Sequence, residues 1–424
     1  MKKLVAAALA ALVTTSVCTS FTGCNSNNND NTTGGSFATL PDQTTVSTDS
    51  TSESIESEST SSENNGNSTV VDPSMKGFNI LTGEPFINNV EMNRPIAIVV
   101  DNTPQASATQ TGLDQADILY EALVTYGTTR FVMVSADYKL LDKVSNIREG
   151  VGYHMDLAGY HNAVLVCHGG FNTAEKSFQT LAEERYGNRY GFIDTSAEKY
   201  FNQASYAEQY GTIEKAEDRK DLKNNIVFKP NAISDLIANP SSKFISQGQG
   251  TFMAAPENGG LKFVEYGTKK DLSGASYAKE ITLNFKCPGY SSTNKYVSYT
   301  YDAEKGKYMR FQADTSKEIV PHVDAQTGEQ LGFTNVITLF TNVEVKDTGI
   351  ETDPQITVFD NKSSGEAGIG YYFTDGKVIS ISWETTENGL KMTEKDTGAD
   401  LLLNTGNTYI GYLDQSYLTA QFWQ

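Results

Sequence analysis

The chain has 424 residues, of which 52 are acidic and 33 are basic, so its formal net charge is −19. Nucleic acids and anionic lipid headgroups are bound by clustered Lys and Arg, and this acidic balance argues against both kinds of partner. No run of about 18 apolar residues is present, so no helix is predicted to span a bilayer. The length predicts two or three domains, and 22 Tyr and 20 Phe can supply a sizeable core.

Residues 1–23 have the pattern of an export signal peptide. A positively charged MKK start precedes an apolar stretch, residues 4–13, that is too short to cross a membrane. The signal ends in the sequence FTGC, which resembles the lipobox of bacterial lipoproteins and makes Cys24 the predicted lipidation site. Acyl chains on Cys24 would anchor the protein to the bacterial membrane on its extracytoplasmic face. The alternative is a secreted protein in which Cys24 is incidental.

Residues 24–75 are predicted to form a disordered tether. Between residues 25 and 73 the composition is almost entirely Asn, Ser, Thr, Gly and acidic residues, with eight Asp or Glu and no Lys or Arg. Such a segment buries too little apolar surface to offset the entropy of ordering, and its like charges repel one another. It is expected to hold the folded part away from the membrane.

Residues 76–240 are predicted to form a mixed α/β domain. The apolar run at 96–100 (IAIVV) is typical of a buried central strand, and it ends at Asp101-Asn102. Residues 116–124 and 129–134 predict two further strands joined by a short connection that contains glycine.

The stretch 144–171 attracts the most interest for function. It contains Arg148 at a turn, a helix-like segment, and an apolar run at 163–167 that stops at His168-Gly169-Gly170. An α/β protein places its ligand site at the carboxyl ends of strands, so this stretch is where we expect a site.

Helices are expected after this stretch. Asn172 with Glu175, and Thr195 with Glu198, have capping-box spacing and predict two helix starts. Residues 230–238 predict a third, short helix.

Residues 248–424 are predicted to form a β-rich domain. Helical periodicity gives way to short alternating segments between turn signals such as Asp375-Gly376. Strands are expected at 296–301, 336–340, 356–359, 378–383 and 401–403. The predicted fold class is therefore α+β, with an N-terminal mixed α/β domain followed by a β-rich C-terminal domain.

Short motifs spread over residues 77–424 together resemble a known family. In chain order they are Leu81-Thr82-Gly83, Arg94-Pro95-Ile96-Ala97, Asp101-Asn102, Gly112 to Asp117, Tyr120-Glu121, Thr129-Arg130-Phe131, Ile147-Arg148, His168-Gly169-Gly170, His322-Val323-Asp324, Thr327-Gly328, Asn335-Val336-Ile337, and Gly370 to Lys377. Their order and spacing are similar to those of the YerB-type bacterial lipoproteins, a family with N-terminal and C-terminal modules of unknown function. The resemblance implies an exported lipoprotein and supplies no established reaction.

Three positions depart from the family pattern. A second arginine is expected three residues after Arg148, where this chain has Val151. The histidine that commonly precedes His168 is Cys167, and a Pro-His-Asn feature is replaced by Lys223-Asn224-Asn225. The loss of these polar groups favours binding over catalysis.

The sequence does not predict a metal site, a cofactor or a nucleophilic enzyme. His154, His161 and His168 recur every seven residues, but His168 follows a strand, so the three do not share one helical face. Ser196 and Lys199 fit a Ser-x-x-Lys pattern whose companion Lys-Thr-Gly is absent.

Two cysteines belong to the predicted domains. Cys167 precedes His168, but neighbours on a strand point to opposite faces and do not form a Cys–His pair. Cys167 and Cys287 lie in apolar runs and are expected to be buried thiols, with a disulfide as the alternative.

Ligand binding is the remaining possibility. Polar residues end separate apolar runs, and arginine suits bidentate recognition of carboxylate or phosphate. The candidate ligand-binding residues are Asp101, Asn102, Glu121, Arg130, Arg148 and His168. The alternative for the arginines is a structural ion pair with an acid such as Glu121.

These observations predict an exported, lipid-anchored surface protein that binds an envelope component, a small anionic ligand or a protein partner without catalysis. One alternative is an envelope hydrolase that uses Asp101, Glu121 or His168 as acid and base. The other is an extracytoplasmic scaffold that acts through the β-rich domain.

Overall fold

The computed structural model describes most of the chain beyond residue 76. The described residues are 77–86, 94–125, 127–170, 180, 192–194, 213–215, 226–233, 257–346, 355–357, 367–386, 389–420 and 422–424. All of them belong to one compact unit, Asn64–Gln424. The predicted signal peptide, tether and lipidated Cys24 lie outside the described residues, as do the two helix starts at Asn172 and Thr195.

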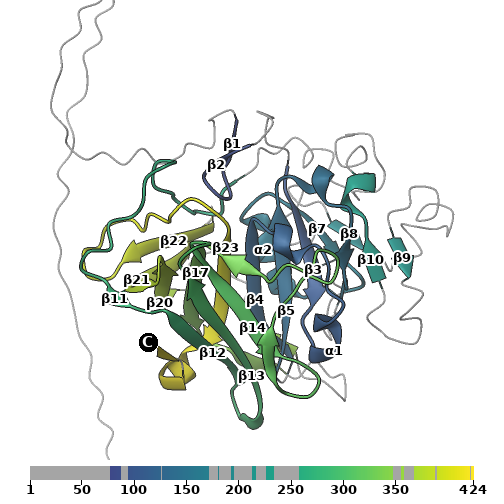
Figure 1. Cartoon of the computed structure of the whole chain (residues 1–424). Helices are drawn as coiled ribbons and strands as arrows, with labels where there is room; N and C mark the ends of the chain where they lie inside the picture. Colours follow the sequence, from purple (N-terminus) through teal and green to yellow (C-terminus); the bar gives the residue numbers. More distant parts are fainter. Residues whose placement is uncertain are drawn as a thin grey trace, which may run out of the picture. The chain divides into compact units, whose positions relative to one another are not determined.

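The architecture is dominated by one large sheet, which has 11 strands within the described residues. Its order is β11-β21-β20-β17-β23-β4-β5-β3-β7-β8, with β22 paired to β21, and Figure 1 shows its blue and green-to-yellow strands. The strands from the first half of the chain are β3 (Ile96–Asp101), β4 (Ile118–Thr125), β5 (Thr128–Ser135), β7 (Val164–Cys167) and β8 (Phe192–Asp194). Those from the second half are β11 (Ser276–Tyr277), β17 (Asn335–Thr341), β20 (Ala367–Thr374), β21 (Lys377–Thr386), β22 (Gly389–Glu394) and β23 (Thr408–Asp414).

A parallel pairing of β4 with β23 joins the two halves of the chain. Its register runs from Thr408 opposite Ile118 to Gly411 opposite Glu121. On its other side β23 pairs in parallel with β17. Strands from 76–240 and from 248–424 therefore lie in one sheet, and the boundaries of the two predicted domains stay a prediction.

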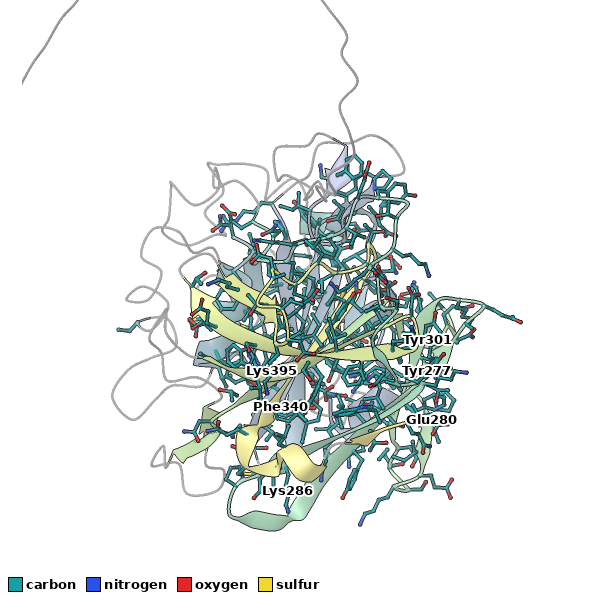
Figure 2. All side chains as sticks on the ribbon, turned by 90° about the vertical axis from the view of Figure 1, so that its left-hand side faces the viewer. Tyr277, Glu280, Lys286, Tyr301, Phe340 and Lys395 are labelled. Atoms are coloured by element: carbon teal, nitrogen blue, oxygen red, sulfur yellow. The ribbon has the colours of Figure 1, made fainter. Side chains whose placement is uncertain are left out.

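A second sheet covers one face of the large one. Its strands are β12 (Glu280–Cys287), β13 (Tyr290–Asp302), β14 (Lys307–Ala313), β15 (Ile319–Pro321), β16 (Gly332–Phe333) and β24 (Phe422–Trp423). Apolar side chains from both sheets, such as Phe131, Leu283 and Tyr299, share one buried core. At its margin the Lys286 ammonium lies 4.4 Å from the ring centroid of Tyr417, and Figure 2 shows Lys286 beside the yellow helical turn η7 (Gln415–Ala420).

The opposite face of the large sheet carries a second core. It includes Val99 and Val132 from the sheet, Met155 and Leu157 from helix α2 (Gly152–Gly159), and Leu403. Alternating residues of β3, β4 and β5 enter the two cores, which is why these strands are apolar almost throughout.

The remaining elements are short. They are β1 (Phe78–Asn79), β2 (Glu84–Pro85), α1 (Pro104–Ser107), η1 (Leu113–Gln115), η2 (Tyr138–Leu140), β6 (Val144–Ser145), β9 (Ile213–Lys215), β10 (Ile226–Phe228), η5 (Pro230–Ile233), β18 (Glu344–Lys346) and β19 (Gln355–Thr357). Helix α1 starts where Thr103 accepts a hydrogen bond from the Ala106 amide and a proline occupies the first turn.

The α+β prediction is wrong, because the protein is β-rich. Strands make up 50% of the structure and helices 11%, and the described α-helices are α1 and α2. The apolar segments of the first half are rich in β-branched residues, and they form strands of a large sheet that β4 joins to the second half by pairing with β23. The helix predicted at 230–238 is a 3₁₀ turn as far as Ile233, and its remainder lies outside the described residues.

Several local predictions can be compared with the structure directly. The strands expected at 96–100, 116–124 and 129–134 are present as β3, β4 and β5. Residues 401–403 do not form the expected strand, since Leu403 makes only an isolated bridge with Phe263. Cys167 and Cys287 are both buried thiols that are not joined in a disulfide, as expected.

Asp117 connects the start of β4 to three other segments by hydrogen bonds. Its carboxylate accepts hydrogen bonds from the Asn79 side chain at 2.9 Å and the Ala136 amide at 2.7 Å. Its carbonyl accepts from the Thr408 amide at 2.9 Å. Burial raises the pKa of Asp117 to about 6, so the folded state binds this proton more tightly than the unfolded chain does.

We expect Asp117 to make stability depend on pH between about 4 and 6. The raised pKa stabilises the folded state at low pH, and this contribution is lost as pH rises through 6. Because the Asp117 side chain keeps some exposure, we expect this contribution to the free energy of unfolding to be about 2 kcal/mol. Urea unfolding gives the difference in unfolding free energy between wild type and Asp117→Asn. From pH 4 to pH 7 this difference should change by about 2 kcal/mol in favour of the variant. A difference that is constant with pH would contradict the assignment.

Candidate functional site

Asp101, the last residue of β3, is the meeting point of two arginines. It lies opposite Arg130 of β5 in the antiparallel register, and its Oδ1 accepts a hydrogen bond from Arg130 Nη1 at 3.1 Å. Arg148 Nε lies 3.6 Å from Oδ2 of the same carboxylate. A main-chain hydrogen bond to β3 positions Arg148, because its amide donates to the Val99 carbonyl at 3.0 Å.

Glu149 completes a group of four that we call the outer cluster: Asp101, Arg130, Arg148 and Glu149. Its carboxylate lies 3.1 Å from Arg148 Nε and 3.6 Å from Arg130 Nη2. Asp101 is only 1% exposed, whereas Arg148 is 17% and Glu149 32% exposed. The outer cluster therefore meets solvent on the side of Arg148 and Glu149.

His168-Gly169-Gly170 supports the outer cluster through its main chain. The His168 amide donates to the Arg148 carbonyl at 2.9 Å, and the Gly150 amide donates to the Gly169 carbonyl at 2.9 Å. Gly169 has a φ of +82°, which favours glycine. The structure thus brings the predicted site residue His168 to Arg148 through a main-chain hydrogen bond.

Glu121 of β4 is the centre of a second group, buried between the two sheets, that we call the inner cluster. Its carboxylate accepts hydrogen bonds from Thr129 at 2.6 Å, Asn102 at 2.7 Å and Tyr409 at 2.7 Å. Arg310 Nη2 of β14 lies 2.9 Å away, and both side chains are fully buried. Lys295 Nζ of β13 lies 3.8 Å from the same carboxylate.

Arg310 is surrounded by aromatic rings and neutral acceptors. Its guanidinium carbon lies 5.0 Å from the Phe131 ring centroid and 5.4 Å from that of Tyr409. It donates to the Tyr299 hydroxyl at 2.6 Å and to His322 Nδ1 at 3.0 Å. Stacking on rings and planar hydrogen bonding are the properties that distinguish arginine from lysine at such a position.

A hydrogen-bonded chain runs from Arg310 back to the outer cluster. Because His322 Nδ1 accepts from Arg310, its Nε2 carries the proton and donates to the Gln110 side-chain oxygen at 2.5 Å. The Gln110 amide group in turn donates to the Asp101 carbonyl. Burial, reinforced by the positive charge of Arg310, lowers the pKa of His322 well below its usual value, so the ring is neutral.

The charges of the inner cluster are set by burial and by neighbours. Burial alone would raise the pKa of Glu121, but Arg310 and Lys295 outweigh it and hold that pKa below its usual value. Burial lowers the pKa of Lys295 to about 7, although Glu121 opposes the shift. At neutral pH Glu121 is therefore a carboxylate, while Lys295 titrates.

The candidate residues named from the sequence all come from the first half of the chain. The structure brings Asp101, Arg130 and Arg148 together and places Asn102 and Glu121 in the adjoining inner cluster. The second-half residues Lys295, Arg310, His322 and Tyr409 were missed as site residues. One signal was available: Arg310 lies between Tyr308 and Gln312 at the buried positions of β14, where a charge is unusual.

The described residues contain neither a cluster of metal ligands nor a membrane-spanning helix. Among the described residues, no group of three or more His, Cys, Asp or Glu side chains is placed to hold a metal ion. In the same residues, no helix has both the length and the apolar character needed to cross a bilayer.

Comparison with known proteins covers both halves of the chain. The family described as "Protein of unknown function (DUF3048)" matches with its N-terminal domain at residues 81–235 and with its C-terminal domain at 286–410. YerB of Bacillus subtilis (strain 168), whose name proposes a lipoprotein, is 25% identical over 336 residues, covering 78% of this chain and 84% of YerB. A crystal structure of the Bacillus subtilis YerB protein shares the fold, with a TM-score of 0.58 at 22% identity over 82% of this chain and 99% of the other.

We expect the buried pair of Glu121 and Arg310 to act as a unit in stability. Replacing Arg310 by Met leaves a desolvated carboxylate without its arginine and should destabilise the fold by about 3–5 kcal/mol. The double variant Glu121→Leu with Arg310→Met should recover most of that loss, because neither charge is then buried. Urea unfolding of the two single variants and the double variant measures the coupling.

The matched control is the exposed ion pair of Lys391 and Glu384, which are 2.7 Å apart. Its disruption by Lys391→Met should leave the urea midpoint unchanged. Additive effects of the Glu121 and Arg310 replacements would contradict the coupled-pair interpretation.

Proposed function

Since the chain belongs to the YerB-type DUF3048 family, we propose that it is an exported, lipid-anchored cell-surface protein that binds a small anionic ligand of the envelope at the outer cluster, without catalysis. The observation that carries the proposal is the convergence of Arg130 and Arg148 on one carboxylate, with Arg148 still reached by solvent. A guanidinium held in this way is ready to bind a carboxylate or a phosphate.

The exposed side of the outer cluster favours exchange of Glu149 for a ligand. Its carboxylate contacts Arg148 at 3.1 Å and is 32% exposed, and ion pairs with this degree of exposure contribute little to stability. The deeper Asp101 stays bonded to Arg130 and keeps both arginines oriented. An incoming anion would thus displace the Glu149 carboxylate from Arg148. Because Arg130 and Arg148 are already oriented, less entropy would be lost on binding.

Several contacts support binding over the hydrolase alternative. A general acid needs a proton to give, but the pKa of Glu121 lies below its usual value, and its carboxylate is occupied by three neutral donors and Arg310. The carboxylate of Asp101 contacts two arginines. These acids are placed to orient cations.

Isothermal titration of the purified protein with inorganic phosphate, small carboxylates and cell-wall fragments tests the proposal. Arg148→Ala should weaken binding by about 10- to 100-fold, the range expected for a lost charged hydrogen bond. Glu149→Gln is the matched control, because it removes the competing carboxylate and should bind as tightly as wild type or more tightly. No heat with any of these anions, or binding unaffected by Arg148→Ala, would refute the proposal.

The lipid anchor has a separate test in bacterial cells. Cys24→Ser should move the protein from the membrane fraction to the medium and abolish incorporation of a labelled fatty acid, because the acyl chains are attached to that sulfur. Cys18→Ser, a change within the signal peptide, should leave both properties unchanged. If Cys24→Ser stays in the membrane fraction, Cys24 is not the anchor.

A further inference from the structure

Lys295 is a buried amine that the proposed anion site does not use. It comes from β13 and is 10% exposed. Its Nζ donates a hydrogen bond to the Asn102 carbonyl and lies 3.8 Å from a Glu121 oxygen. It is thus held at the side of the inner cluster nearest to Asp101 and Asn102.

Lys295 shares its nearest carboxylate, that of Glu121 at 3.8 Å, with a closer cation. Glu121 is already paired with Arg310 at 2.9 Å, and three neutral donors occupy its oxygens. The nearby Asp101 is paired with Arg130 at 3.1 Å. A protonated Lys295 would be the second cation on one buried carboxylate, in a place where burying an unbalanced charge is unfavourable.

The pKa of Lys295 agrees with this charge count. Burial is the main cause that lowers it to about 7; Glu121 and Asp101 raise it, and Arg310 and Arg130 contribute to lowering it. An ordinary lysine has a pKa of about 10.4, so only about one amine in 2,500 is neutral at pH 7. For Lys295 the neutral, nucleophilic form is about half of the population at that pH.

We propose that Lys295 is a nucleophilic amine that forms an imine with a small aldehyde or keto compound, at a covalent site separate from anion exchange at the outer cluster. The lone pair of the neutral Nζ attacks the carbonyl carbon, and the carbonyl π electrons move to oxygen to give a carbinolamine after proton transfer. The nitrogen then gives up its second hydrogen, the hydroxyl leaves as water, and a carbon–nitrogen double bond forms. No oxidant or reductant is consumed.

Reductive trapping tests the proposal on the folded protein. Acetaldehyde carries no anionic group, so its reaction does not depend on the arginines of the outer cluster. The protein is treated with acetaldehyde and cyanoborohydride between pH 6 and pH 10, and ethylated lysines are located by peptide mass spectrometry. At pH 7 Lys295 should be labelled at least about ten-fold faster than Lys305 on an exposed turn, with a labelling midpoint near pH 7.

Two variants complete the experiment. Lys295→Arg keeps a cation without a nucleophilic amine, and Lys295→Met removes the charge while leaving the pair of Glu121 and Arg310 intact; both should lose only the fast label. If Lys295 in the wild type reacts no faster than Lys305, or reacts with a midpoint near pH 10, the proposal is wrong, whatever the titrations with anions show.

Discussion

The burial of one carboxylate, that of Glu121, is the constraint on which the rest of the structure depends. Removing a carboxylate from water costs several kcal/mol unless an opposite charge and hydrogen-bond donors replace the solvent. Arg310 supplies the charge from the second sheet, and Asn102, Thr129 and Tyr409 supply the donors. A shift of one residue in either strand would turn Glu121 or Arg310 to the other face and leave its partner buried alone. The pair therefore specifies how the two sheets meet.

The same constraint positions the outer cluster near the surface. Asn102, which bonds Glu121, is the neighbour of Asp101, which contacts Arg130 and Arg148. From the second half of the chain, the bonds from Arg310 through His322 and Gln110 end on the Asp101 carbonyl. Asp101 is thus fixed by side chain and main chain together. Arginines that are oriented before a ligand arrives lose less conformational entropy on binding it.

The sequence reveals the strands and the polar residues that end them, because a long apolar run followed by Asp101-Asn102 is a local pattern. It does not reveal that β4 pairs with β23, some 290 residues later, since pairing between distant strands leaves no local signal. That pairing brings Tyr409 to Glu121 and places the second sheet with Arg310 over it. The α+β prediction failed because the apolar runs of the first half join one large sheet with strands of the second half, an arrangement that leaves no local signal.

The two clusters also influence one another through charge. Arg130 lowers the pKa of Lys295 and Asp101 raises it. An anion bound to Arg130 and Arg148 adds negative charge on the same side, so it raises the pKa of Lys295 and converts the amine to its unreactive protonated form. By linkage, any reaction that keeps Lys295 uncharged weakens the binding of the anion by the same factor. The arrangement of charges therefore implies that an anion at the outer cluster and a covalent ligand on Lys295 oppose each other.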